Sequence, residues 1–157
     1  LGAYGVIKRC VRVSEVRVPV TALADPGAFK IYMADTGLLC SRFDIAASLV
    51  LSGDHRMDGF KGALTENYIM QALVTAGIQP YYWTLQQNAE LDFVFQDRQG
   101  NIIPLEAKSA EPVRAKSLGM IMKRHDCPYA IRVSARIFGF ENGIHSIPLY
   151  ELFSRVK

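Results

Sequence analysis

Asn88-Ala-Glu-Leu-Asp-Phe-Val-Phe95 and Asn101-Ile-Ile-Pro-Leu-Glu-Ala-Lys108 are two apolar runs of strand length that carry acidic residues where hydrophobic ones are expected. Side chains two apart on a strand share a face, so Glu106 and Lys108 are expected to project together, with Asp92 beside them from the neighbouring strand. Two carboxylates and one ammonium at one spot can hold a divalent metal and activate a water. Spacing alone favours a simpler alternative, a polar sheet face on which Lys108 pairs with one of the acids.

A long helix is predicted for residues 60–76, because apolar side chains recur through this segment and Gly77 follows it. Apolar residues surround most of its circumference, which is typical of a buried helix. At 100° per residue, Glu66 projects between Met70 and Leu73. A buried carboxylate without a partner is costly, so we expect Glu66 to have a cation, a hydrogen-bond donor or a metal beside it.

Three consecutive strands are predicted after this helix, at residues 81–85, 90–95 and 102–108, with polar turns between them. Further expected elements are a helix at 113–124 that starts at Pro112, strands at 128–133 and 144–149, and a helical turn at 150–156. This order predicts an α/β domain with a mixed sheet. Pro104 lacks a ladder donor and is expected near a strand start or at a sheet edge.

The N-terminal part is predicted to contain shorter elements. Residues 5–20 alternate valine or isoleucine with charged residues, as in an exposed strand or hairpin, and residues 24–28 have the composition of a turn. A short strand is expected at residues 30–34, and a helical piece at 44–51. The chain begins at Leu1 in mid-pattern. We therefore expect residues 1–28 to be an arm or hairpin at the end of a missing upstream region, and residues 29–157 to form the α/β domain.

Composition narrows the class of protein. The chain has 157 residues, half of them hydrophobic, and a net charge of +3, which suits one globular domain that is mildly basic. No apolar run is long enough to span a membrane, and no secretory signal begins the chain. The three scattered cysteines are expected to be reduced thiols in a cytoplasmic protein. No phosphate-binding loop for ATP is present.

Two short motifs favour structural interpretations over chemical ones. Asp35-Thr36-Gly37 matches the aspartic-protease triplet, but no second copy exists to pair the carboxylates, so we expect Asp35 or Thr36 to cap a short helix. His125 and Cys127 lack the paired, tightly spaced ligands that are usual in zinc sites, and no zinc is expected.

Nucleic-acid contacts have two sets of candidates. Lys116, Lys123 and Arg124 would share about a third of a helix circumference and could touch a phosphate backbone, although a solvated face is the commoner role. The run Tyr81-Tyr-Trp83 could stack on bases, although aromatic side chains in strands more often pack in the core.

A family resemblance joins these motifs in one order: Gly62-Ala-Leu-Thr-Glu66-Asn, Tyr81-Tyr-Trp, Ala89-Glu-Leu-Asp92-Phe-Val and Ile103-Pro-Leu-Glu106-Ala-Lys108. Together they resemble the PD-(D/E)xK nuclease-like superfamily, and more narrowly the uncharacterised domain that follows the ATPase module in a family of prokaryotic AAA+-type ATPases. The segment Phe29-Lys-Ile-Tyr-Met-Ala-Asp35-Thr-Gly-Leu-Leu is similar to the opening of that domain. The resemblance covers about residues 29–150, and Leu91 stands where the superfamily often has proline.

The resemblance implies a restriction-endonuclease-like core with a mixed central sheet flanked by helices. It implies that Glu66, Asp92 and Glu106 ligate magnesium or manganese and that Lys108 assists the attacking water. It also implies an upstream ATPase module of the same polypeptide as a partner. Two functions follow as hypotheses. One is a metal-dependent phosphodiesterase acting on DNA or RNA, and the other is a non-catalytic nucleic-acid- or protein-binding regulatory module of the ATPase that can also self-associate.

Overall fold

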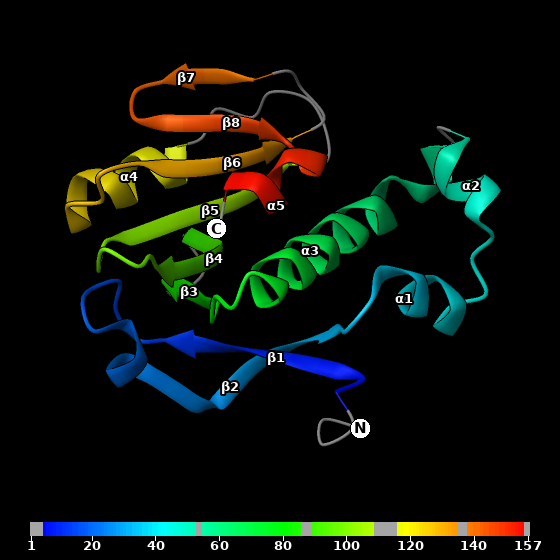
Figure 1. Cartoon of the computed structure of the whole chain (residues 1–157), viewed down its shortest axis with the longest axis horizontal. Coiled ribbons are helices and arrows are strands. Elements are labelled where there is room, and N and C mark those ends of the chain that lie inside the picture. The colour runs from blue at the N-terminus through cyan, green and yellow to red at the C-terminus, as the bar shows by residue number, and fades with distance from the viewer. Residues whose placement is uncertain (1–4, 53–54, 86–88, 109–115, 135–137, 156–157) are drawn as a thin grey trace.

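A mixed β-sheet with helices on both faces organises the chain (Figure 1). The computed structural model describes residues 5–52, 55–85, 89–108, 116–134 and 138–155, apart from the side chains of residues 85, 89, 116 and 117. Within these ranges, eight strands lie in the order β2-β1-β3-β4-β5-β6-β8-β7. The strands are β1 (Ile7–Val13), β2 (Ala24–Met33), β3 (Tyr81–Leu85), β4 (Ala89–Gln96), β5 (Ile102–Lys108), β6 (Ala130–Ser134), β7 (Gly139–Glu141) and β8 (Ile144–Pro148). The predicted α/β class with a mixed sheet is confirmed.

Five α-helices occur in the described ranges: α1 (Thr36–Arg42), α2 (Ala47–Leu51), α3 (Asp58–Thr75), α4 (Lys116–His125) and α5 (Leu152–Arg155). Three short 3-10 helices are η1 (Val20–Leu23), η2 (His55–Met57) and η3 (Leu149–Glu151). Neighbouring strands are parallel in the pairs β1–β3, β5–β6 and β6–β8, and antiparallel in β1–β2, β3–β4, β4–β5 and β7–β8.

Two hydrophobic cores lie on opposite faces of the sheet. The α3-side core joins Ile69, Met70 and Leu73 of α3 to strand residues such as Phe93 and Leu105. The α4-side core joins residues of α4 to the other face of the same strands; its members include Leu118, Ile121, Leu91, Val94, Trp83 and Tyr81. Because strand side chains alternate between faces, membership of either core shows which way a side chain points.

Helix α3 runs across one face of the sheet (Figure 1). A buried side-chain amide fixes it to strand β2. Asn67 Oδ1 accepts from the Met33 backbone N–H at 2.8 Å, and Asn67 Nδ2 donates to the Met33 carbonyl at 3.2 Å. The side chain is almost fully buried, so these bonds satisfy polar atoms that water cannot reach. The predicted helix at 60–76 is confirmed, with a start two residues earlier.

The N-terminal strands belong to the same sheet. Strand β1 pairs with β3 in parallel and with β2 in antiparallel fashion. Residues 24–28, predicted as a turn, instead form the first half of β2, so that prediction was wrong. The pairing with β1 shifts register between Val11 and Arg12, which accommodates Pro26 and Gly27 within the strand. The boundary expected between residues 28 and 29 falls inside β2.

Several local predictions are confirmed, with small shifts in their bounds. Asp35 is the N-cap of α1, and its carboxylate accepts from the Leu38 backbone N–H at 3.2 Å. Strands β6 and β8 and helix α4 lie where they were expected, whereas Pro112 lies outside the described residues. Strand β7 was not predicted. Pro104 is buried in β5, just before the pairing with β6 begins at Leu105, so its missing N–H leaves that ladder intact.

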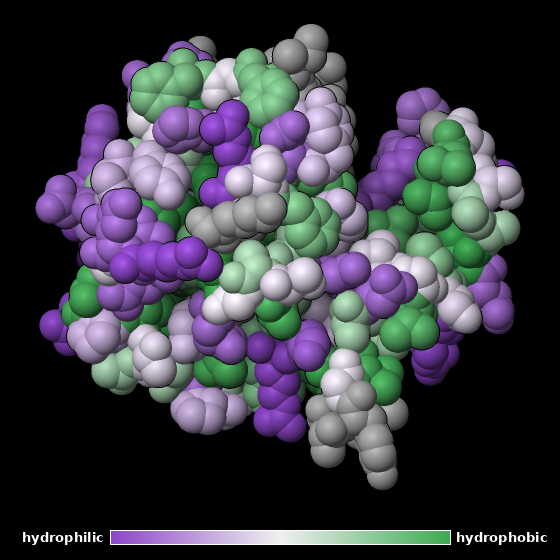
Figure 2. All heavy atoms as spheres, viewed as in Figure 1, coloured by the Kyte–Doolittle hydropathy of each residue, from purple (hydrophilic) through white to green (hydrophobic). Residues whose placement is uncertain are grey.

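Helices α1 and α2 stand beside the sheet and contain no buried residue (Figure 1). Leu38, Phe43 and Leu51 are exposed there, and Figure 2 shows apolar surface gathered on this projecting part. Among the residues that the structure describes, no helix is long and apolar enough to cross a membrane.

Candidate acidic site

Glu106 and Lys108 point to the α4 side of the sheet. Leu105 and Ala107, which alternate with them along β5, pack in or against the α3-side core. Lys108 Nζ lies 3.0 Å from Glu106 Oε1, and Glu106 is only 6% exposed. The prediction that these two side chains project together is therefore confirmed, and they form a partly buried ion pair.

A β-bulge in β4 turns Asp92 towards the α3 side. Trp83 pairs with Leu91 and Tyr81 pairs with Val94. An interval of two residues on β3 therefore lies opposite an interval of three residues on β4, which defines the bulge. Leu91 packs in the α4-side core, and its neighbour Asp92 takes the other face. The extra residue lets Phe93 also reach the α3-side core.

The Asp92 carboxylate reaches into the plane between β4 and β5. Its Oδ2 accepts from the Ala107 backbone N–H at 2.8 Å, and strand N–H groups lie in the plane of their sheet. The last backbone pair between these strands is Phe93 with Leu105, so the carboxylate takes over the role of a ladder acceptor where the pairing ends. Asp92 thus sits between the two faces.

Glu66 lies on the α3 side, where it has a donor and a cation. Tyr32 donates its hydroxyl to Glu66 Oε2 at 3.0 Å, and Lys30 Nζ lies 3.9 Å from the same oxygen. The expectation that Glu66 requires a partner is confirmed, but the partners come from β2. Burial first, and then the nearby Glu66 charge, raise the pKa of Tyr32, so the phenol remains a donor.

Lys30 is a site residue that the sequence did not reveal. Its Nζ donates to Glu90 Oε1 at 2.6 Å and lies 5.2 Å from the centre of the Tyr82 ring. Burial lowers the pKa of Lys30, but the hydrogen bond to Glu90 and the charges of Glu66 and Asp92 outweigh it and leave the pKa above its usual value. The sequence did contain one signal that could have revealed Lys30. A lysine and a tyrosine at alternate positions of an otherwise apolar strand share one face.

The pKa of Asp92 depends on carboxylates on both sides of the sheet. Its pKa is raised to about 6, mainly because burial penalises the charged form. The Ala107 hydrogen bond and the Lys30 charge lower the pKa, whereas the charges of Glu66 and Glu106 raise it. The balance raises the proton affinity of Asp92, and a further cation close to it would favour the ionised form.

The three expected metal ligands do not form one coordination shell. Among the described residues, no three side chains of His, Cys, Asp or Glu are placed to hold one ion together. Glu66 lies on the α3 side and Glu106 on the α4 side, with Asp92 between them. Magnesium, however, needs only one or two carboxylates together with waters. Asp92 Oδ1 accepts no hydrogen bond from the described part of the chain, and Asp92 and Glu106 lie on adjacent strands.

The basic residues expected to contact nucleic acid are only partly placed. Lys123 and Arg124 are exposed in the last turn of α4. The side chain of Lys116 lies outside the described residues. Tyr81 and Trp83 are buried in the α4-side core, which confirms the packing interpretation for these two aromatic side chains.

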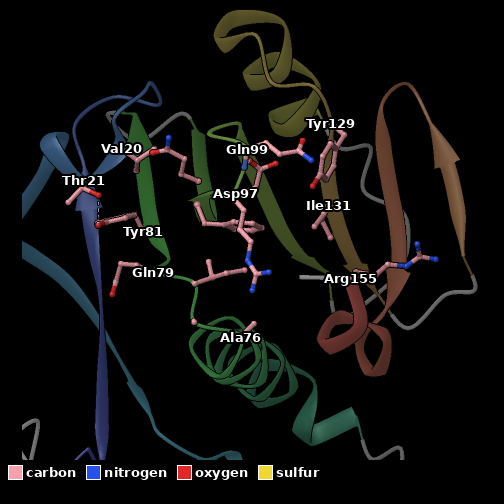
Figure 3. A pocket seen from close by; sticks show the side chains of 15 residues that line it. Val20, Thr21, Ala76, Gln79, Tyr81, Asp97, Gln99, Tyr129, Ile131 and Arg155 are labelled. Atoms are coloured by element: carbon pink, nitrogen blue, oxygen red, sulfur yellow. Dashed lines mark hydrogen bonds between the residues drawn. The ribbon is translucent and has the colours of Figure 1, made fainter. Parts of the chain in front are cut away.

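A separate hollow of about 720 Å³ lies at the opposite end of the strands (Figure 3). The chain after α3, the turn after β4 and the start of β6 surround it, and Gln79, Asp97, Tyr129 and Arg155 are among its lining residues. No residue of the acidic site lines this hollow, so the two features are distinct.

Comparison with known proteins gives one match. A family model for a domain of unknown function, DUF4143, matches residues 61–152. No curated protein and no solved structure matches the chain. The matched span contains Glu66, Asp92, Glu106 and Lys108 but begins after Lys30.

Proposed function

The chain belongs to the DUF4143 family of unknown function, and from that premise we propose that it is a nuclease-like domain that hydrolyses phosphodiesters of nucleic acid with a divalent metal. The supporting observation is Asp92, a carboxyl with a raised pKa between the charges of Glu66 and Glu106. The order of strands and acids is compatible with the restriction-endonuclease-like core of the PD-(D/E)xK superfamily. An upstream ATPase module is the proposed partner.

Asp92 and Glu106 are the proposed ligands of magnesium or manganese. A bound ion would supply a polarised phosphoryl oxygen and a more acidic water. Asp92 is held by the Ala107 N–H, so its free oxygen is already oriented. Glu66, engaged by Tyr32 on the other side, acts on Asp92 through its charge and is not a ligand of this ion.

Lys108 is the proposed catalytic cation. Its ammonium is held 3.0 Å from Glu106, on the side of the sheet that faces α4. A compact positive charge there orients the attacking water and stabilises the charge that develops on the phosphate. The water oxygen bonds to phosphorus and its proton passes to solvent, while the P–O bond to the leaving oxygen breaks and that oxygen takes a proton from solvent to become an alcohol. Lys123 and Arg124 belong to α4, and they are proposed to contact the nucleic-acid backbone.

A second candidate is a non-catalytic regulatory module that binds the ATPase, nucleic acid or a second copy. One observation favours it: each acid already has a protein partner. Tyr32 donates to Glu66, Ala107 to Asp92, and Lys108 pairs with Glu106. A site whose charges are satisfied in this way can be a stable polar link between elements without turnover.

Manganese titration followed by calorimetry separates a metal site from a structural ion pair. We expect binding to the wild type and loss of binding in Asp92→Ala, because this change removes one of two carboxylate ligands. Glu141→Ala, which removes an exposed acid from β7, is the matched control and should bind as the wild type does. Equal binding by Asp92→Ala would contradict the assignment of Asp92 as a ligand.

Cleavage assays then separate the two functions. Lys108→Ala should lower the rate of metal-dependent cleavage of DNA or RNA by about a hundredfold or more, while manganese binding survives. Lys8→Ala, in β1, is the control and should retain activity. Unchanged cleavage in Lys108→Ala would show that the assignment of Lys108 is wrong. Metal binding without cleavage of any nucleic acid would favour the regulatory module.

A further inference from the structure

A second position for a cation exists on the α3 side of the sheet, and the chain fills it with its own side chain. We propose that Lys30 is a tethered cation that takes the place of a second divalent metal ion between Glu66 and Glu90. This inference rests on the proposed function in one respect, namely that the first ion is held by Asp92 and Glu106.

Contacts from three separate elements meet at the Lys30 ammonium. It is 2.6 Å from Glu90 Oε1 on β4 and 3.9 Å from Glu66 Oε2 on α3, while Lys30 itself comes from β2. The Tyr82 ring of β3 lies beneath it at 5.2 Å from the ring centre. Carboxylate oxygens on one side and the face of an aromatic ring on the other form a cage that suits a positive charge.

The charges around this position exceed what one ammonium neutralises. Glu66 and Glu90 bring two carboxylates to this ammonium, at 3.9 Å and 2.6 Å. Tyr32 adds only a neutral donor to Glu66. Without Lys30, these two carboxylates would face one another, and one or two carboxylates together with waters are enough to hold magnesium or manganese.

The proposed first ion and the Lys30 ammonium belong to different sides of the sheet. Glu106, a proposed ligand of the first ion, points to the α4 side, whereas Glu66 contacts Lys30 on the α3 side. An ion at the Lys30 position would therefore be a second ion and not a displaced first one.

The test is the number of manganese ions that each chain binds, measured by calorimetry and checked by electron paramagnetic resonance of free manganese. We expect one ion for the wild type and two for Lys30→Met, which keeps a flexible chain of similar length but removes the charge. Lys30→Arg retains the charge and should bind one. Lys8→Met makes the same substitution at a lysine of β1 that has no part in either site and should also bind one.

A second variant locates the new ion. Adding Glu66→Gln to Lys30→Met should return the number of bound ions from two to one, because Glu66 serves only the α3-side position. An unchanged count of two in the double variant would overturn the inference.

The outcomes distinguish this inference from the proposed function. One ion in both the wild type and Lys30→Met overturns the inference and leaves the proposed function standing. No ion in the wild type but one in Lys30→Met supports the inference and removes the first metal site. No ion in either protein overturns both. If Lys30→Met is unfolded alone, manganese should restore its folded circular-dichroism spectrum, and failure to do so overturns the inference.

Discussion

The carboxyl of Asp92 makes the stability of the protein depend on pH. Its pKa is about 6 in the folded chain, against 3.8 for an ordinary aspartate. The native state therefore binds the proton more tightly, and between pH 4 and pH 6 the free energy of unfolding falls as the pH rises. Below pH 4 the Asp92 carboxyl is protonated in both the folded and the unfolded chain. Above pH 6 its ionisation lowers the free energy of unfolding by the full amount, about 3 kcal/mol.

Asp92→Asn isolates this contribution, since the amide oxygen can still accept from the Ala107 N–H. Urea unfolding at several pH values should show that the variant gains stability relative to the wild type between pH 4 and pH 6, with no further relative change above pH 7. Parallel pH profiles for the two proteins would show that Asp92 titrates normally in the folded state.

At the level of single residues, sequence reasoning placed the neighbours on one strand better than the contacts between strands. Alternation along β5 was enough to place Glu106 beside Lys108. It could not reveal the bulge that moves Asp92 towards the α3 side and the sheet plane, because the bulge depends on how β4 pairs with β3. Lys30 was missed because its partner Glu90 is 60 residues away, and no local pattern encodes that contact.

Among the contacts between elements, the Asn67 amide is the one that fixes α3 to β2. Asn67→Ala should lower the free energy of unfolding by about 1–3 kcal/mol, because it leaves the Met33 N–H and carbonyl without their partner. Gln71→Ala is the matched control. Gln71 accepts from Thr36 at longer distances of 3.3 Å and is less buried, so the loss should be smaller. Chemical denaturation of both variants gives the comparison.

Equal losses for Asn67→Ala and Gln71→Ala would contradict the special role of the buried amide. Asn67 adjoins Glu66 on α3, so the same attachment lies beside the contacts of Glu66 with Tyr32 and Lys30 of β2.

Elements with strong local patterns were predictable, and elements defined by distant pairing were not. Helix α3 and strands β3, β4 and β5 follow from periodicity and turn residues. The Pro26-Gly27 turn signal was overridden because β1 supplies a partner for residues 24 and 25. Strand β7 has three exposed residues, too few for an alternation to be visible.

For the whole molecule, the two cores meet at the sheet, and the proposed metal ligands belong to its central strands. The pairing of β4 with β5 places Asp92 and Glu106 on adjacent strands. The unfolded chain lacks this pairing and does not hold the two acids near each other. An ion that binds the folded state alone must therefore stabilise the whole domain. At a manganese concentration of a hundred times the dissociation constant, the gain is about 2.7 kcal/mol.

Manganese should accordingly raise the melting temperature of the wild type by about 5–11 °C, because a domain of this size gains about 2–4 °C per kcal/mol. Asp92→Ala should show almost no rise, and Glu141→Gln, an exposed acid on β7, should behave as the wild type does. Differential scanning calorimetry with and without manganese measures these shifts. If Asp92→Ala rose as much as the wild type, the ion would be bound elsewhere on the surface. A larger rise for Lys30→Met than for the wild type would follow from two ions binding where one bound before, since each adds its own binding free energy to the stability of the same cooperative sheet.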